Sequence, residues 1–343
     1  MSCADVAELA AALDSGSSGH CARAGSSPVI RSYCGKDHRE IDGLFVFLAF
    51  FSRNGILIAD VQILIQGGDL MMHLEYLKNE QPWGDKPFRP DLQGAVLEGK
   101  RGRILVTILR AGGEGKHPTI LLAHGIPGVE KNLDLAQGLR RVGFHVVTFH
   151  YSGSWNSAGD YGIDHCLEDS ETVLEYIKKD TEMNFDTKQL YVVGHSMGCF
   201  IAAHLAAKHP ELKAAVTIAP CDMGEGMMSE KGREQMKAIF ESAAPWLSGT
   251  SAQALYEETE KNKEAYQLSA LAGTLKDVPM YCINAKLDEE CSADVHALPW
   301  VHAVNAVGGK VEHEEWVTDH SFSDMRDQLI EAVAIYLIEQ VEK

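Results

Sequence analysis

Short segments that are apolar throughout alternate with amphipathic segments over residues 71–343. A short uninterrupted apolar segment is typical of a strand buried on both faces of a parallel sheet, whereas apolar residues at helical spacing predict a covering helix. The pattern therefore predicts one α/β domain with a mostly parallel sheet and helices on both faces. We expect strands at residues 119–123, 145–150, 190–193, 214–218, 279–284 and 310–317, and helices at about 132–142, 164–179, 197–208 and from about 323 to the end.

Two local patterns refine the ends of this domain. The segments 95–97 and 103–109 are joined by a turn sequence and predict a hairpin at an edge of the sheet. Ser321 followed three residues later by Asp324 has the form of a capping box, so the last helix is expected to begin next to it.

Residues 219–278 interrupt the alternation, because they separate two predicted strands by far more than an ordinary loop. They are rich in helix formers and carry several methionine and aromatic side chains, which predicts a helical cap over a pocket that accepts an apolar group. The alternative is that these side chains only attach the insertion to the domain. They are Met223, Met227, Met228, Met236, Phe240, Trp246, Leu247 and Tyr256.

Residues 1–70 differ from the rest of the chain. Their hydrophobic residues recur at no sustained period, and the apolar stretch at 44–65 has neither helical nor alternating order. We expect either a weakly ordered N-terminal extension or sequence translated from a wrong start. No apolar run approaches the roughly 18 residues that span a membrane, and no basic residue precedes Arg23 as a secretory signal would require.

Charge and cysteine content narrow the class of protein. The formal net charge of -18 disfavours phosphate backbones and anionic lipid surfaces. Small neutral or weakly charged molecules are therefore expected as partners rather than nucleic acid or membrane. The 8 cysteines include no CxxC pair, which is typical of reduced thiols in a cytoplasmic protein. A homodimer is compatible with this composition.

The segment 189–206 carries the most specific chemical signal. An apolar strand runs into Gly194-His195-Ser196-Met197-Gly198, and a helix follows at once. A strand-to-helix turn this tight strains the serine and lifts its hydroxyl clear of the sheet edge, with glycines on either side because larger residues would collide there. Ser196 is therefore predicted to be a nucleophile, and the alternative is a small-residue junction without chemistry.

A serine nucleophile needs a base, and the base needs a carboxylate that holds one tautomer. Among 15 histidines, His320 follows the last predicted strand and so lies at the carboxyl edge of the sheet. The loop after strand 279–284 supplies the carboxylate, with Asp288 as the leading choice and Glu289 and Glu290 as runners-up. The alternative role of His320 is that of a helix-capping surface residue.

A second turn, His124-Gly125-Ile126-Pro127-Gly128, directly follows an apolar strand. Glycine lets the backbone approach a reacting carbonyl, and proline fixes the turn. We expect the backbone N–H groups of Ile126 and Met197 to form an oxyanion hole, and His124 to brace the loop. No histidine or cysteine spacing fits a metal site and no glycine pattern fits a phosphate loop, so no metal or cofactor is expected.

Together these motifs resemble the α/β-hydrolase superfamily, in which serine, aspartate and histidine follow in this chain order. The resemblance covers about residues 95–343 and is nearest to cinnamoyl (feruloyl) esterase-like and prolyl-oligopeptidase-like carboxylesterases, which also insert a helical cap at this place. It implies an α/β-hydrolase fold with a Ser196, His320, Asp288 triad.

The expected activity is hydrolysis of small to medium acyl or aryl carboxylic esters through an acyl-enzyme. An aminopeptidase or acyl-peptide hydrolase with the same triad remains open because of Glu257, Glu258 and Glu260, as does a thioesterase. A non-catalytic ligand receptor on this fold is the alternative outside enzymes.

Overall fold

The computed structural model describes residues 49–52, 55–58 and 72–341. The chain divides into two units, Met1–Glu75 and Tyr76–Lys343. In the first unit, β1 (Ala49–Ser52) pairs antiparallel with β2 (Gly55–Ile58). Apart from these two strands, the expectation for residues 1–70 lies outside the described residues.

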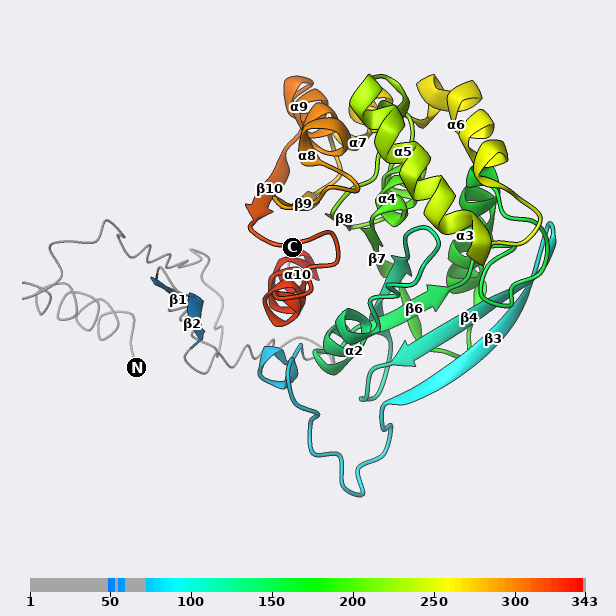
Figure 1. Ribbon diagram of the computed structural model, residues 1–343. Coiled ribbons are helices and arrows are strands. Elements are labelled where there is room, and N and C mark those ends of the chain that lie inside the picture. The colour runs from blue at the N-terminus through cyan, green and yellow to red at the C-terminus, as the bar shows by residue number, and fades with distance from the viewer. Residues whose placement is uncertain (1–48, 53–54, 59–71, 342–343) are drawn as a thin grey trace, which may run out of the picture. The chain divides into compact units, whose positions relative to one another are not determined.

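The second unit is built on an 8-stranded sheet in the order β10-β9-β8-β7-β5-β6-β4-β3 (Figure 1). All neighbouring pairs from β6 through β10 are parallel, whereas β4 pairs antiparallel with both β6 and β3. The predicted edge hairpin and the mostly parallel sheet are confirmed. The strands are β3 (Asp91–Gly99), β4 (Gly102–Arg110), β5 (His117–Ala123), β6 (His145–Phe149), β7 (Phe185–His195), β8 (Ala214–Ile218), β9 (Met280–Ala285) and β10 (Val311–Trp316).

The central strands are apolar throughout because both of their faces are covered. Every residue of β5, β8 and β9 is buried, whereas β3 at the edge alternates between exposed and half-buried positions. Helices cover both faces, with α2 (Leu133–Arg141) packed beside α10 (Arg326–Val341) and α3 (Ile163–Lys179) packed beside α4 (Met197–Lys208).

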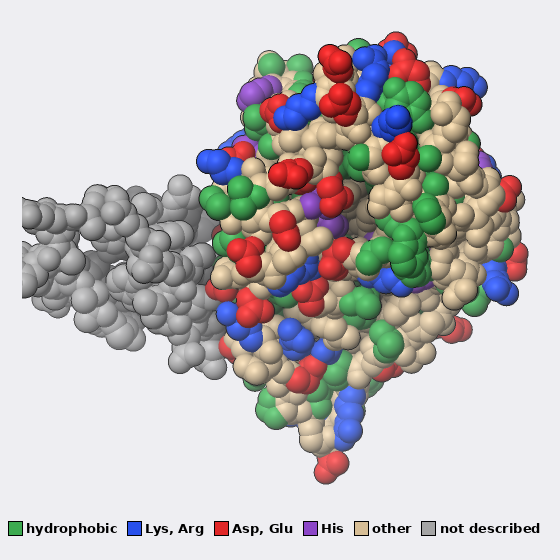
Figure 2. Space-filling view, viewed as in Figure 1, with side chains coloured by type: hydrophobic (Ala, Val, Ile, Leu, Met, Phe, Trp, Pro, Cys, Tyr) green, Lys and Arg blue, Asp and Glu red, His purple; other side chains and the backbone are tan. Residues whose placement is uncertain are grey.

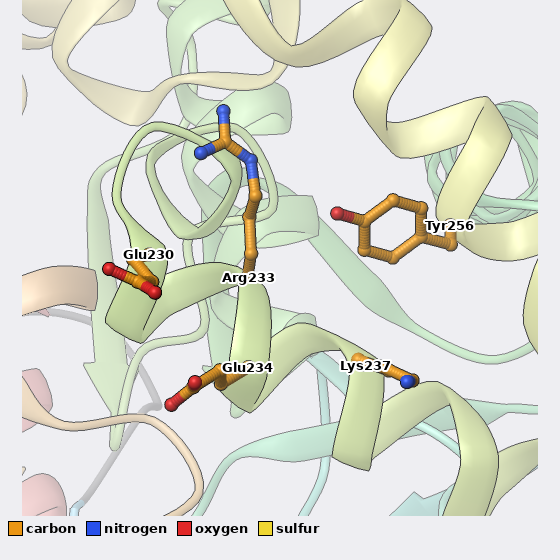
Figure 3. Close-up of a pocket in the computed structure, with 5 residues that line it drawn as sticks. All are labelled: Glu230, Arg233, Glu234, Lys237 and Tyr256. Atoms are coloured by element: carbon orange, nitrogen blue, oxygen red, sulfur yellow. The ribbon is translucent and has the colours of Figure 1, made fainter.

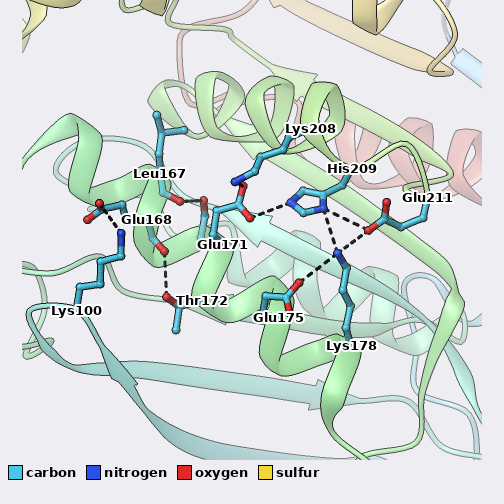
Figure 4. Close-up of polar contacts among 11 residues, drawn as sticks. Lys100, Leu167, Glu168, Glu171, Thr172, Glu175, Lys178, Lys208, His209 and Glu211 are labelled. Atoms are coloured by element: carbon cyan, nitrogen blue, oxygen red, sulfur yellow. Dashed lines mark hydrogen bonds and ion pairs between the residues drawn. The ribbon is translucent and has the colours of Figure 1, made fainter.

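Ion pairs fix α3 against the end of α4. Glu171 of α3 binds Lys208 at 2.9 Å and the ring of His209 at 2.8 Å, and Lys178 of α3 binds Glu211 (Figure 4). Such partly exposed pairs stabilise a fold by about 0 to 1 kcal/mol each, so they set the helix register while the apolar core supplies most of the stability.

The segment between β8 and β9 is helical, as predicted. It forms η2 (Glu225–Met227), α5 (Glu230–Ala243), η3 (Ala244–Trp246), α6 (Ala252–Tyr266), η4 (Leu268–Leu271) and α7 (Ala272–Leu275). Most of its soft side chains are buried in the same core cluster as the main domain: Met223, Met227, Met236, Phe240 and Leu247. These five attach the insertion, while Met228 and Trp246 are exposed.

Two predictions about elements were wrong or incomplete. The last helix begins at Arg326, and Asp324 accepts a hydrogen bond from the Thr318 hydroxyl at 2.5 Å in place of closing a capping box with Ser321. The sequence reading also missed α8 (Ala293–His296) and α9 (Leu298–Ala306), although proline at the start of α9 and buried Trp300, Val301 and Val304 carry a helical signal.

Candidate active site

Ser196 lies at the junction of β7 and α4 in a strained backbone conformation, with φ 58° and ψ -126°. The flanking glycines are required by space: a Cβ on Gly194 would lie 2.1 Å from the carbonyl oxygen of Gly198, and a Cβ on Gly198 would lie 2.1 Å from that of Ala123. Serine has no ordinary preference for this region, so the strain is held by the surrounding strands and helix. The tight turn expected from the sequence is therefore present.

His320 and Asp288 are in direct contact. The Nδ1 of His320 lies 2.6 Å from Oδ2 of Asp288, and the other oxygen, Oδ1, accepts from the backbone N–H groups of Glu290 and Cys291 at 2.9 and 2.8 Å. Asp288 is 6% exposed. Of the three carboxylates that the sequence leaves open, Asp288 is thus the one that holds the imidazole.

At both Asp288 and His320, burial shifts the pKa in one direction and the contact between the two side chains shifts it in the other. Burial alone would raise the pKa of Asp288, but the hydrogen bond and charge of His320, with the two backbone donors, hold that pKa below its usual value. Burial alone would lower the pKa of His320, but the hydrogen bond and charge of Asp288 raise it above its usual value. Asp288 therefore stays ionised, and its negative charge favours the protonated form of the His320 ring.

His195 joins the His320 loop to the strand that carries Ser196. Its Nε2 lies 2.9 Å from the backbone oxygen of His320, and the centroids of the two rings are 5.0 Å apart. Burial, followed by the charge of His320, lowers the pKa of His195 to about 3, so its ring is neutral near pH 7. Because a carbonyl can only accept, Nε2 carries the proton and donates.

The three residues sit at one edge because their strands are neighbours in the sheet. Ser196 follows β7, Asp288 follows β9 and His320 follows β10, and the parallel order β10-β9-β8-β7 places these strand ends together. No hydrogen bond joins the Ser196 hydroxyl to the His320 ring, although both residues are described. Such bonds are often long before substrate binds. In Figure 2 a histidine side chain lies near the middle of the face, among acidic side chains.

The loop 124–128 lies against the nucleophile. A Cβ on Gly125 would be 2.8 Å from Cβ and 3.1 Å from Oγ of Ser196, so glycine is needed for this close approach. His124 braces the loop through its Nδ1, 2.7 Å from the Gly125 oxygen, and Tyr151 donates its hydroxyl to the His124 oxygen at 3.0 Å. Burial lowers the pKa of His124 to about 3, so its ring adds no charge to the loop.

Met197 is the first residue of α4, so its N–H has no acceptor within the helix. Ile126 belongs to the loop that packs on Ser196, and its peptide bond to Pro127 is cis. Both predicted donors are thus carried by segments that border the serine.

The sequence predicts no role for Trp155 and Lys131 and marks Trp246 only as a side chain of the helical insertion, but the structure places all three beside this loop. Trp155 donates its indole N–H to the Pro127 oxygen at 2.7 Å, Trp246 lies next to it with ring centroids 5.8 Å apart, and Lys131 places its ammonium 4.1 Å from the centre of the Trp155 ring. They come from three separate segments, so only the tertiary structure brings them together.

A cavity of about 460 Å³ lies elsewhere, between α5 and α6 (Figure 3). Its lining is mostly charged, and Tyr256 of α6 projects toward α5 across it. None of the predicted site residues line it, so it is separate from the candidate site. The lining residues are Glu230, Arg233, Glu234, Lys237 and Tyr256.

The described part of the chain contains neither a cluster of metal ligands nor a membrane-spanning helix. Within residues 49–52, 55–58 and 72–341, no group of three or more histidine, cysteine, aspartate or glutamate side chains could hold a metal ion. In those same residues no helix has the length and apolar character needed to cross a bilayer.

Comparison with known proteins agrees with this architecture. The family model described as alpha/beta hydrolase fold matches residues 118–270. The lysophosphatidylserine lipase ABHD12 of Danio rerio is 32% identical over 98 residues, which is 28% of this chain and 25% of that protein, and ABHD12 of Gallus gallus is 33% identical over 95 residues. The match thus spans about a quarter of these curated relatives.

Solved structures share the fold at low sequence identity. The Pyrococcus furiosus esterase Pf2001 superposes with a TM-score of 0.55 at 15% identity, covering 76% of this chain and 97% of its own. The Pyrococcus horikoshii acylaminoacyl peptidase gives 0.58 at 14% identity, covering 74% and 42%, and a Bacillus coagulans carboxyl esterase gives 0.56 at 15%, covering 72% and 98%. The chain has the α/β-hydrolase fold.

Proposed function

We propose that this protein is a serine carboxylester hydrolase that works through an acyl-enzyme on small to medium acyl or aryl esters. The observation that carries the proposal is the His320–Asp288 hydrogen bond of 2.6 Å at the sheet edge where the strained Ser196 lies. Carboxyl esterases among the structural neighbours, and lipases among the curated relatives, support the same reaction class.

In the proposed reaction, His320 takes the proton of the Ser196 hydroxyl as the oxygen attacks the ester carbonyl. The backbone N–H groups of Ile126 and Met197 stabilise the negative oxygen of the tetrahedral intermediate. His320 returns the proton to the leaving alcohol, and water then releases the acid by the same steps. Asp288 keeps the Nδ1 proton of His320 in place and stabilises the charged ring.

An aminopeptidase or acyl-peptide hydrolase is the second candidate, since an acylaminoacyl peptidase shares the fold. Such an enzyme would need acidic side chains ready to hold a free amine. The glutamates of α6 are already engaged: Glu257 accepts from Gln253, Glu258 from the Asp164 N–H, and Glu260 from Lys263. This arrangement favours the ester hydrolase over the peptidase.

Location and thiol chemistry are part of the proposal. The described cysteines are all free and buried, at positions 166, 199, 221, 282 and 291. Buried unpaired thiols are typical of a reducing compartment, which supports a cytoplasmic location.

Hydrolysis of 4-nitrophenyl acetate and butyrate by the wild-type chain and by Ser196→Ala tests the proposal. We expect the substitution to lower kcat by about 10⁴-fold or more while the unfolding transition is retained, because it removes the proposed nucleophile and leaves the rest of the site in place. A Ser196→Ala protein with wild-type turnover would show that Ser196 is not the nucleophile.

A further inference from the structure

Lys131 carries a positive charge that no acidic side chain neutralises. Neither an ion pair nor a hydrogen bond joins its ammonium to another described residue, whereas most lysines of the domain contact a carboxylate. Its ammonium lies instead over the Trp155 ring, 4.1 Å from the centre. An aromatic face attracts a cation and fixes its position, but leaves the capacity of the cation to bind an anion unused.

Trp155 and Trp246 form a fixed aromatic pair beside this charge. Their ring planes are inclined by 33°, and Trp246 is 57% exposed. The segment after Trp246 is tied to the loop that carries Trp155 by two backbone hydrogen bonds, from Ser248 N–H to the Gly153 oxygen at 2.8 Å and from Tyr161 N–H to the Ser248 oxygen at 2.9 Å. An exposed indole that is held this firmly is suited to bind an apolar group.

Val129 extends this surface, since it is 62% exposed and belongs to the same loop as Lys131. We call the set of Val129, Lys131, Trp155 and Trp246 the Trp–Lys surface. Hydrophobic side chains also gather beside the central histidine in Figure 2.

One loop connects the Trp–Lys surface to the nucleophile. At Gly125 it packs on Ser196, and at Pro127 its carbonyl oxygen accepts the indole N–H of Trp155. Two residues of chain span at most about 7 Å, so the Trp155 indole lies close to the proposed nucleophile and not in a distant part of the domain.

We propose that the Trp–Lys surface binds the part of the substrate next to the scissile ester, and that the preferred substrates are esters in which an apolar chain or ring carries an anionic group. This rests on the proposed ester hydrolase function. The aromatic pair takes the apolar portion and Lys131 binds the anion. A local cation is needed for this because the net charge of -18 repels anions at long range.

The test compares matched neutral and anionic esters. On the acyl side the pair is 4-nitrophenyl hexanoate and mono-4-nitrophenyl adipate, and on the alcohol side it is the butyrates of 4-methylphenol and 4-hydroxybenzoic acid. For each pair the readout is the ratio of kcat/KM for the anionic ester to kcat/KM for the neutral one. Intrinsic reactivity of the esters cancels when variants are compared.

Lys131→Met is expected to lower this ratio by about tenfold for one of the two pairs, as for loss of a half-desolvated charge contact. Lys131→Arg should keep the ratio within about threefold, because it retains the charge. Lys188→Met is the matched control, since Lys188 is exposed on another part of the domain and loses the same charge. Trp246→Ala should weaken the neutral and anionic members of the responsive pair alike, by about fivefold or more.

The outcomes separate this inference from the function on which it rests. An unchanged ratio in Lys131→Met, or an equal loss in Lys188→Met, would overturn the inference while ester hydrolysis stands. No hydrolysis of any of the four esters by the wild-type chain would overturn the proposed function. Titration of the Ser196→Ala variant with the anionic ester, followed by tryptophan fluorescence, then still tests binding, and equal affinity after Lys131→Met would refute a role for that lysine.

Discussion

Replacement of His195 by leucine tests how the proposed base is held in position. His195 is 2% exposed, and its Nε2–H donates to the backbone oxygen of His320 at 2.9 Å. Leucine fills a similar volume but has no donor, so the His320 oxygen loses that partner. Nothing places His195 against the substrate, which separates its effect from that of a binding residue.

The size of the effect follows from the lost hydrogen bond. A buried acceptor left without its donor costs about 1 to 3 kcal/mol, and a barrier that rises by 1.36 kcal/mol slows a reaction about tenfold. Because the lost hydrogen bond allows His320 to move away from its position, kcat should fall by about 10- to 100-fold. KM should change less than about threefold. His195→Gln offers an amide N–H at a similar reach, so it should recover most of kcat.

The assay is kcat and KM on 4-nitrophenyl butyrate for wild type, His195→Leu and His195→Gln, with urea unfolding of each as the control for folding. The reasoning would be refuted by a leucine variant with wild-type kcat. A glutamine variant as slow as the leucine variant, with normal unfolding, would show that the donor is irrelevant. A loss confined to KM would place His195 in substrate binding instead.

Three further predictions concern the same site. Activity should fall as the pH drops through the pKa of His320, because the base must be neutral to take a proton. Asp288 raises that pKa above its usual value. A rate profile from pH 4 to 9 with no acid limb near or above pH 6.5 would contradict this prediction. Asp288→Asn should slow turnover by about 10³- to 10⁴-fold and move the acid limb to lower pH, whereas Glu289→Gln should change kcat less than about twofold. Gly125→Ala should reduce kcat by about 100-fold, because the added Cβ would lie 2.8 Å from Cβ of Ser196. Gly273→Ala is the control and should keep full activity, because its added Cβ would meet nothing within 4 Å. Equal activity of the two variants would refute the steric argument.

The central strands could be predicted because burial on both faces leaves an unbroken apolar sequence. Residues 214–218 and 197–208 coincide with β8 and α4 to the residue. The strained turn at Ser196 was also predictable, because no residue larger than glycine fits at the positions on either side of it.

Features decided by tertiary contacts could not be read from local pattern. The start of α10 depends on Asp324 binding Thr318, a partner on the preceding loop. The sequence made Asp288 the leading choice over Glu289 and Glu290, but only the tertiary structure shows which of the three adjacent carboxylates reaches His320. The Trp–Lys surface joins two loops and η3, and side chains from separate segments leave no periodic pattern in the sequence.

The most direct test of the account is the stoichiometry and position of labelling by a fluorophosphonate, measured by intact mass and peptide mapping. A phosphonate that bonds to an activated serine hydroxyl with loss of fluoride reports the nucleophile without assuming a substrate. The account predicts one label per chain on Ser196, none on Ser196→Ala, and much slower labelling of His320→Ala. Labelling of folded Ser196→Ala at the wild-type rate, or no labelling of the folded wild-type protein, would contradict it.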